Sequence, residues 1–220
     1  DHEFLERNFG DEGATGVLWK YGTTATANED DADPTLISSY WSDASVANQD
    51  QLSDLEYNLR EWAAEIVLPH NDGYWCCAHN FYVYEHPERG LMFVPWDMDY
   101  TFDSAPYWAD PTTWYRGADA AHFDQVAADP VWGPQLVDTL REVVDAFDPE
   151  EIEGWAREWG EQVHDAFADD PHTSMSVTEH EQAVERLAVY PHARHGWLDS
   201  WLRCRQAGDV DADGDGHGAC

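Results

Sequence analysis

The chain has 220 residues, enough for one domain with a sizeable core, and its 12 tryptophans and 14% aromatic content are not those of a disordered chain. It carries 45 acidic residues against 11 basic ones, a formal net charge of −34. A chain this acidic repels phosphate backbones, which argues against nucleic-acid binding, and it attracts divalent cations. A solvated acidic surface accounts for most of the charge. No run of about 18 apolar residues occurs, so no membrane span is predicted.

The N-terminal part predicts a helix, a strand and a loop. Residues 1–10 are typical of the last turns of a helix that ends at Gly10, and residues 16–22 are typical of a short strand ending in glycine. Residues 23–48 are rich in Thr, Asp, Asn and Ser and show little periodicity, which predicts a loop.

A helix and a β-hairpin follow in the middle of the chain. Apolar residues recur at helical spacing over residues 51–68, and Asp50 or Ser53 is the expected N-cap. Two strand-like runs, residues 81–84 and 91–94, are joined by a turn that contains proline and glycine. This pattern predicts a hairpin of two antiparallel strands.

The second half of the chain is predicted to be mostly helical after an irregular segment at residues 103–130. Asp148 followed by Pro149 is a favourable helix start, with the aspartate as cap and the proline just inside. A hairpin with helices on both sides in sequence indicates an α+β fold. The helices are expected at about 131–147, 150–168, 177–189 and 192–204.

The cysteines have no zinc-site spacing and instead raise the question of disulfides. Cys76 and Cys77 are adjacent and therefore poorly placed to pair with each other. In an oxidising compartment, a bridge from Cys76 or Cys77 to Cys204 is the plausible long-range pair. The chain begins at Asp1 and stops at Cys220 within a motif, so we expect it to be a piece of a longer protein.

Polar residues gather around the predicted hairpin. Asp72 follows the preceding helix, Asn80 precedes the first strand, and Asp97 and Asp99 follow the second. Antiparallel pairing brings Asn80 and Asp97 to the same end of the ribbon, where their oxygens suit Mg²⁺ or Mn²⁺. The order aspartate, asparagine, aspartate is that of a phosphoryl-transfer site. Ordinary loop aspartates and an asparagine turn cap are the alternative interpretation.

Two segments of this region, HNFYVYE and FVPWDMDYTFD, resemble the CotH kinase family of spore-coat proteins. The upstream FLERNFGDEGATGVLWKYG and the late HARHGWLDSWL resemble it as well, so that the resemblance covers roughly residues 1–203, with residues 70–103 the most specific part. The resemblance implies the C-terminal lobe of an atypical protein-kinase-like fold, mostly helical, with a central β-hairpin that carries the metal site.

The resemblance also assigns roles. Asp72 matches the catalytic aspartate, Asn80 the metal-coordinating asparagine, and the pair Asp97 and Asp99 contains the metal-binding aspartate, with Asp97 slightly favoured. The implied cofactors are ATP and Mg²⁺ or Mn²⁺. His79 is expected to orient the loop rather than to bind metal.

Other side chains of this block are expected to be structural, and the nucleotide-binding part is missing. Trp75, Trp96 and Phe102 are predicted to lie in the core. No glycine-rich loop precedes the block, and Lys20 is the only lysine. A kinase needs such a loop and a lysine–glutamate pair, so the nucleotide lobe is expected upstream of Asp1 and the piece alone is expected to be inactive.

The last residues of the chain differ in composition from the rest, because they alternate aspartate with small residues. This difference predicts a boundary between a kinase-like domain at residues 1–205 and an Asp/Gly-rich tail at 206–220. Alternate aspartates followed by glycine resemble the calcium repeats of extracellular bacterial proteins, and a flexible acidic linker is the alternative. Because Cys220 stands where an EF-hand has glutamate, the tail is not read as an EF-hand. The possible Ca²⁺ ligands are Asp209, Asp211, Asp213 and Asp215.

Together these features predict a secreted or cell-surface kinase that transfers the γ-phosphoryl of ATP to a hydroxyl of a protein substrate. The alternative is a catalytically inactive surface or coat scaffold that binds a partner protein and uses calcium for rigidity. A metal-dependent hydrolase is disfavoured because the sequence lacks a histidine–carboxylate ligand cluster.

Overall fold

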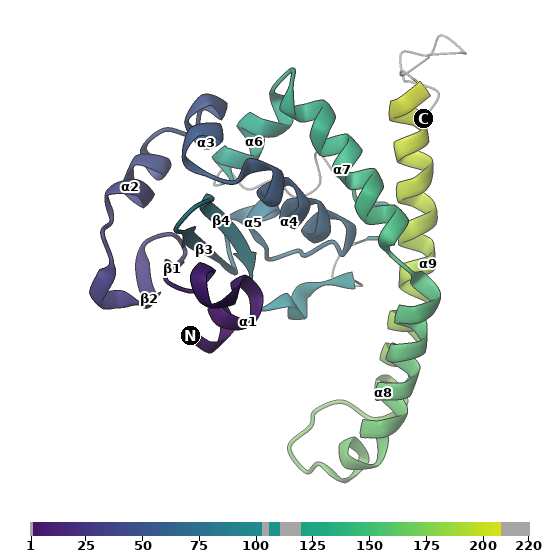
Figure 1. Cartoon of the computed structure of the whole chain (residues 1–220). Coiled ribbons are helices and arrows are strands. Elements are labelled where there is room, and N and C mark those ends of the chain that lie inside the picture. Colours follow the sequence, from purple (N-terminus) through teal and green to yellow (C-terminus); the bar gives the residue numbers. More distant parts are fainter. Residues whose placement is uncertain (1, 103–105, 111–119, 208–220) are drawn as a thin grey trace. The chain divides into compact units, whose positions relative to one another are not determined.

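The computed structural model describes residues 2–102, 106–110 and 120–207, which are mostly helical and include a small sheet (Figure 1). The chain divides into two compact units, Asp1–Thr101 with Asp110–Leu140, and Phe102–Ala109 with Arg141–Cys220. The predicted α+β class is confirmed.

The first unit contains a four-stranded antiparallel sheet in the order β2-β1-β3-β4. The predicted hairpin is confirmed: Phe81 lies opposite Pro95, and His86 lies opposite Gly90 beside the turn. The first predicted strand is confirmed as well, and it pairs with an unpredicted one. The strands are β1 (Val17–Lys20), β2 (Thr24–Ala27), β3 (Phe81–His86) and β4 (Gly90–Pro95).

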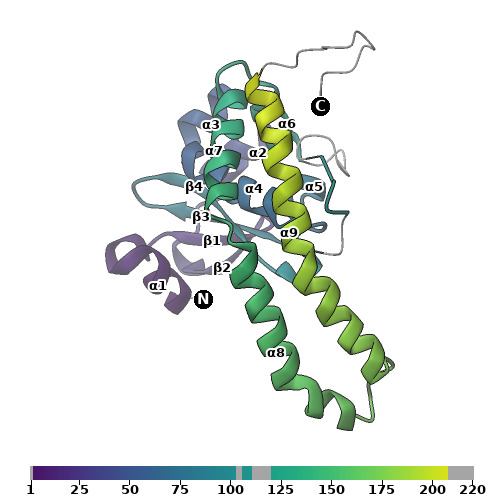
Figure 2. The same ribbon diagram turned by 90° about the vertical axis from the view of Figure 1, so that its right-hand side faces the viewer.

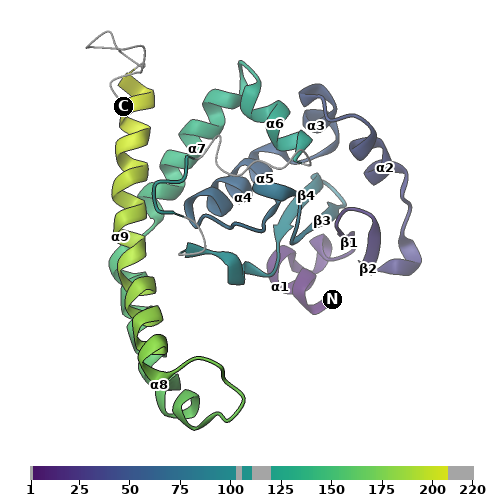
Figure 3. The ribbon, with the colours of Figure 1, turned by 180° about the vertical axis from the view of Figure 1, so that it is seen from behind.

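Alternation along the strands gives the sheet two apolar faces. On one face Phe93 packs against Trp62 of α4 (Leu55–Val67), with ring centroids 5.4 Å apart. The other face lies against α1 (His2–Gly13), as Figure 3 shows from behind. The buried cluster on the α1 face consists of Leu5, Ala14, Leu18, Ala27, Tyr84, Met92 and Val94.

Helix α1 does not stop where the sequence predicts. Gly10 has φ 73°, a left-handed conformation that glycine adopts at no steric cost, and the helix resumes beyond it to Gly13. Gly10 is therefore a kink inside the helical segment rather than its end.

The predicted loop at residues 23–48 is wrong in most of its length. Besides β2 it contains a 3-10 turn, η1 (Glu29–Asp31), helix α2 (Thr35–Ser42) and the start of α3 (Val46–Leu52). Ile37 and Tyr40 are the buried residues of α2. One apolar pair on an eight-residue helix is too short a pattern for periodicity to reveal.

The start of α4 also differs from the prediction. Asp54 is the cap, because its Oδ1 accepts a hydrogen bond from the Tyr57 amide at 3.0 Å. Asp50 lies inside α3 and Ser53 is the C-cap of that helix. The short helix α6 (Ala121–Ala128) lies in the segment predicted to be irregular, where His122 and Phe123 are buried.

The second unit is dominated by two long helices, α8 (Pro149–Asp169) and α9 (Val177–Ala207), which lie side by side (Figure 2). Helix α7 (Trp132–Ala146) leads into it. The predicted cap is confirmed, since Asp148 accepts hydrogen bonds from the Glu150 and Glu151 amides. Ion pairs join the two helices, including Arg157–Glu185 at 2.6 Å.

The two late helices predicted at residues 177–189 and 192–204 are one continuous helix that contains Pro191. A proline inside a helix removes one hydrogen bond and costs about 3 kcal/mol. Buried side chains on both sides of it, Tyr190 and Leu198 among them, offset this cost by packing. Among the helices of the described residues, none has both the length and the apolar character to cross a membrane.

Candidate functional site

The candidate site lies in the first unit, where the segment after α4 meets the end of the hairpin. The chain leaves α4 at Leu68 and passes through residues 70–73 into the one-turn helix α5 (Tyr74–Cys77). The Asn71 amide donates to the Tyr100 carbonyl at 2.8 Å, which ties this segment to η2 (Met98–Tyr100). Residues before and after the hairpin are thus held together by backbone contact.

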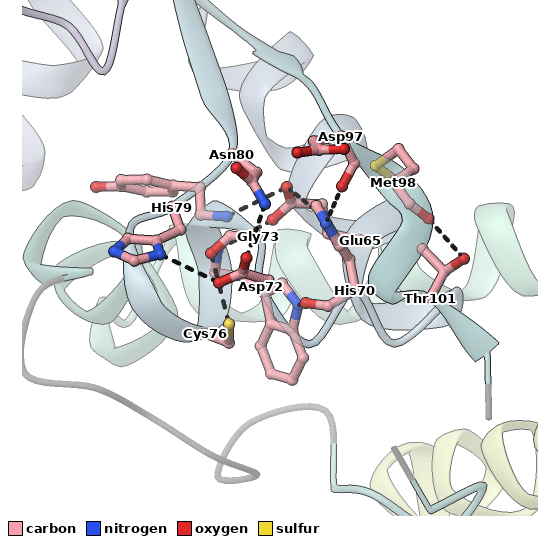
Figure 4. Close-up of polar contacts among 12 residues, drawn as sticks. Glu65, His70, Asp72, Gly73, Cys76, His79, Asn80, Asp97, Met98 and Thr101 are labelled. Atoms are coloured by element: carbon pink, nitrogen blue, oxygen red, sulfur yellow. Dashed lines mark hydrogen bonds and ion pairs between the residues drawn. The ribbon is translucent and has the colours of Figure 1, made fainter. Parts of the chain in front are cut away.

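Asp72 is at the centre of this arrangement (Figure 4). Its Oδ2 accepts a hydrogen bond from Asn80 Nδ2 at 2.9 Å, and its Oδ1 lies 3.1 Å from His79 Nδ1. The Asp72 side chain is 38% exposed, whereas Asn80 is buried. A carboxylate can only accept hydrogen bonds, so it is the NH₂ group of Asn80 that bonds to Asp72. The Oδ1 oxygen of Asn80 therefore remains for another partner. His79 thus contacts the Asp72 carboxylate from the residues that follow α5.

Asp97 lies at the same end of the hairpin as Asn80, as predicted. The Trp96 amide donates to the Asn80 carbonyl at 2.9 Å, which extends the ladder one residue beyond β3 and β4. Asp97 and Asn80 both have positive φ, 56° and 44°, conformations that aspartate and asparagine tolerate better than most residues. Asp99 lies in η2 and is exposed, as is Asp97.

A buried polar network that the sequence analysis missed lies beneath these residues. Glu65 of α4 accepts hydrogen bonds from the amides of Tyr74 and Trp75 at 3.2 and 3.0 Å, and His70 Nδ1 lies 3.3 Å from it. Glu61 lies one turn earlier, and burial together with the neighbouring Glu65 carboxylate raises its pKa well above the usual range. The signal was present in the sequence, because both glutamates stand among the apolar positions of an amphipathic helix.

The cysteine prediction is wrong for Cys76 and Cys77, which form a disulfide with each other. Both belong to the single turn of α5, and both Sγ atoms approach the Gly73 carbonyl, at 3.5 and 3.6 Å. This tight turn brings the neighbouring sulfurs together and leaves neither available to Cys204. The Cys77 Sγ lies 3.9 Å from Asp72 Oδ1, so the disulfide borders the candidate site.

Three aromatic residues near the site are predicted from the sequence to lie in the core. The prediction is confirmed for Trp75, which is 1% exposed, and wrong for Trp96, which is 46% exposed. Trp96 directly follows Pro95, the last residue of β4. Its ring lies beside Tyr82, at 5.8 Å between centroids, and 5.9 Å from the Lys20 ammonium. Phe102 is half-buried and contacts Tyr190 within the second unit.

The oxygens of the site suit a metal that is shared with a substrate. Within the described residues there is no cluster of three or more His, Cys, Asp or Glu side chains able to hold a metal ion. Asn80 Oδ1 and the Asp97 carboxylate are hard oxygen donors of the kind that Mg²⁺ prefers, and Mg²⁺ is commonly bound by one or two protein groups together with phosphates and water. The donor set therefore fits that mode. The proposed calcium ligands Asp209 to Asp215 lie outside the described residues.

Comparison with known proteins identifies the family. The family described as CotH kinase protein matches residues 4–198, which include most of each unit and the whole candidate site. No curated protein and no solved structure shows significant similarity to the chain. The matched region covers most of the sequence, and the chain therefore belongs to the CotH kinase family.

Proposed function

We propose that this chain is the metal- and acceptor-binding part of a secreted protein kinase, which transfers the γ-phosphoryl of ATP to a hydroxyl of a protein substrate. The observation that carries the proposal is the hydrogen bond from Asn80 to Asp72 beside Asp97 in a CotH kinase family member. Phosphoryl transfer depends mainly on positioning and charge stabilisation, and this arrangement supplies groups for both.

In this proposal Asp72 orients the acceptor hydroxyl. Its Oδ2 accepts from Asn80, and its Oδ1 contacts His79 Nδ1. The Cys77 Sγ, 3.9 Å from Oδ1, carries no hydrogen in the disulfide, so each oxygen retains a second lone pair. A partly exposed carboxylate held from two sides can accept a hydrogen bond from an entering hydroxyl without reorienting. As the acceptor oxygen bonds to the γ-phosphorus, the bond from that phosphorus to the β,γ-bridging oxygen breaks and ADP leaves, while the hydroxyl proton passes to the Asp72 carboxylate.

Asn80 and Asp97 would hold Mg²⁺ or Mn²⁺, with Asp99 as the alternative to Asp97. Such an ion, when bound, neutralises charge on the nucleotide phosphates. The role of this chain would be to present the Asn80 amide oxygen and one carboxylate from neighbouring positions at the end of the hairpin. Because the hairpin is fixed in register by its backbone ladder, their spacing is set before any ligand arrives.

Two further parts of the proposal concern the acidic tail and the location. We propose that Asp209, Asp211, Asp213 and Asp215 form a calcium-binding loop, because alternate aspartates before a glycine provide the oxygens and the turn that such loops use. A calcium loop of this kind, together with disulfide formation, suits an oxidising compartment outside the cytoplasm.

The test is phosphate transfer from γ-labelled ATP to a serine-rich acceptor protein by the complete natural polypeptide with Mn²⁺ or Mg²⁺. Asp97→Asn and Asp99→Asn are compared one at a time, with Asp138→Asn on exposed helix surface as the matched control. We expect transfer by the parent and the control and its loss in one aspartate variant. No transfer by the parent, without an ATP-dependent rise in Tm, would overturn the proposal and leave a scaffold that binds a surface or coat partner.

A further inference from the structure

The proposed chemistry leaves the most deeply buried ionisable groups near the site without a role. His70 and Glu65 have side-chain exposures of 0% and 1%. Removing such groups from water is costly, and apolar residues of similar size are often at least as stabilising. A network of this kind in the core therefore calls for an explanation beyond stability.

The Glu65 carboxylate holds the backbone that follows Asp72. Its Oε1 accepts from the Tyr74 amide at 3.2 Å and its Oε2 from the Trp75 amide at 3.0 Å. These are the first two residues of α5, which begins immediately after Gly73. The orientation of the segment that carries Asp72 is thus fixed from within α4.

His70 connects the same carboxylate to the other side of the site. Its Nδ1 lies 3.3 Å from Glu65 Oε1, and its Nε2 lies 3.2 Å from the Asp97 carbonyl oxygen (Figure 4). A carbonyl oxygen only accepts, so Nε2 must carry the hydrogen and donate it. The imidazole is therefore a rigid spacer between α4 and the backbone of Asp97.

Gly73 leaves the room that this spacer needs. A Cβ atom at that position would lie 2.5 Å from His70 Nδ1 and 2.6 Å from Glu65 Oε1, well inside van der Waals contact. Both atoms belong to buried side chains, and the close packing of protein interiors leaves such side chains little room to move. The residue after Asp72 is thus restricted to glycine by the network itself.

We propose that Glu65 and His70 are positioning residues, which set the distance between Asp72 and Asp97 by joining the two segments through one buried chain of hydrogen bonds. The inference deepens the proposed function and rests on it for the roles of the two aspartates. Because the side chains of Glu65 and His70 are buried, their effect on transfer passes through the backbone at Asp72 and Asp97.

A matched pair of substitutions separates the two contacts of the histidine. In His70→Gln the side-chain amide nitrogen stands near the place of Nε2 and keeps a donor for the Asp97 carbonyl. In His70→Asn the shorter amide stands near the place of Nδ1, so the contact with Glu65 is kept and the one with Asp97 is lost. Thermal unfolding of both variants monitors the fold.

The first readout is the Mn²⁺ concentration that gives half-maximal transfer by the complete polypeptide. We expect it to rise about tenfold or more in His70→Asn and less than threefold in His70→Gln, with the KM of the acceptor unchanged. A general loss of stability would instead lower activity in both variants without separating metal dependence from acceptor binding. Equal metal dependence in the two variants would overturn the inference.

The second readout does not depend on kinase activity. The Asn71 amide bonds to the Tyr100 carbonyl and the Trp96 amide to the Asn80 carbonyl, so their hydrogen exchange reports how firmly the two segments are joined. We expect faster exchange at both amides in His70→Asn than in His70→Gln. Faster exchange in His70→Asn, together with a parent that transfers no phosphate, would support the buried link and overturn the proposed function. Equal exchange in the two variants would overturn the link.

Discussion

Asn80 donates its side-chain amide to Asp72 across 2.9 Å, which joins the residue proposed to hold a metal to the residue proposed to orient the acceptor. The contact has a chemical consequence. An aspartate that accepts from a buried amide is held in one rotamer, and the amide in turn presents its oxygen in one direction. Two groups with different proposed roles are thus positioned by a single hydrogen bond between side chains eight residues apart.

Asp72→Asn is expected to lower the rate of transfer by about 10²- to 10⁴-fold, because a carboxamide does not take up the proton of the acceptor hydroxyl. Asn80 can still donate to the introduced carbonyl oxygen, and the side chain is partly exposed, so Tm should change by only a few degrees. Initial rates and thermal unfolding are measured on the same preparations. Retention of more than a tenth of the parental rate would exclude Asp72 from the proton-accepting role.

Asp97→Asn and Asp97→Ala together separate the carboxylate from the backbone conformation. Asp97 has φ 56°, which asparagine tolerates and which costs alanine about 1 kcal/mol. Both variants should lose Mn²⁺ binding as followed by electron paramagnetic resonance, whereas only Asp97→Ala should lose about 1 kcal/mol of unfolding free energy. If Asp99→Asn loses Mn²⁺ binding and Asp97→Asn does not, the metal ligand is Asp99.

The position of these residues was predictable because it follows from short-range rules. Antiparallel pairing of two strands joined by a turn fixes which residues share an end, so the sequence alone predicts that Asn80 and Asp97 lie together. Asp148 could be identified as a cap for a similar reason, since the residues it contacts lie two and three positions away. The roles proposed for these residues come from the family resemblance, because neither spacing nor composition determines them.

The buried network was not predictable because it depends on distances through space. Nothing in the sequence shows that His70 reaches the Asp97 carbonyl, 27 residues away, or that Gly73 lies against both His70 and Glu65. Continuity of α9 through Pro191 was missed for a related reason. The cost of a proline inside a helix predicts a break at Pro191. Buried side chains along the whole length of α9 outweigh that cost by packing.

Glu61→Gln tests the energetic cost of the acidic pair. Burial and the Glu65 carboxylate raise the pKa of Glu61 in the folded protein above the unfolded value near 4.5. The folded state therefore retains a proton that the unfolded state releases. As a result, the free energy of unfolding decreases as the pH rises from about 4.5 toward the pKa of Glu61 in the folded protein. The substitution removes that loss. It should raise the unfolding free energy by about 1 to 3 kcal/mol at pH 7, with little effect at pH 4.

Urea unfolding of parent and variant across this pH range gives the comparison. Glu56→Gln on the exposed side of the same helix is the control, and it should leave the difference from the parent nearly constant with pH. A stability difference for Glu61→Gln that does not grow between pH 4 and pH 7 would mean that Glu61 does not titrate differently in the folded and unfolded states.

Arg194 provides the last test, within the second unit. Its side chain is fully buried on α9, and its Nη1 donates to the carbonyls of Tyr107 and Ala109 at 2.9 and 2.7 Å. Arg194 thereby anchors residues 107–109, which have no regular secondary structure, to α9. The sequence of α9 around Arg194 is the late segment that resembles the CotH kinase family. Lysine keeps the charge but has one donor centre on a flexible stem and lacks the planar fork of the guanidinium.

Arg194→Lys is therefore expected to lower the free energy of unfolding by about 2 to 4 kcal/mol, because it leaves a buried charge and two carbonyls imperfectly paired. Arg203→Lys on the same helix is the control. Arg203 is 74% exposed and pairs with Asp199, and exchanges at such surface pairs change stability by less than about 1 kcal/mol. Urea titrations followed by tryptophan fluorescence measure both. Equal effects of the two substitutions would show that Arg194 fills space in the core but does not hold the 107–109 segment through its hydrogen bonds.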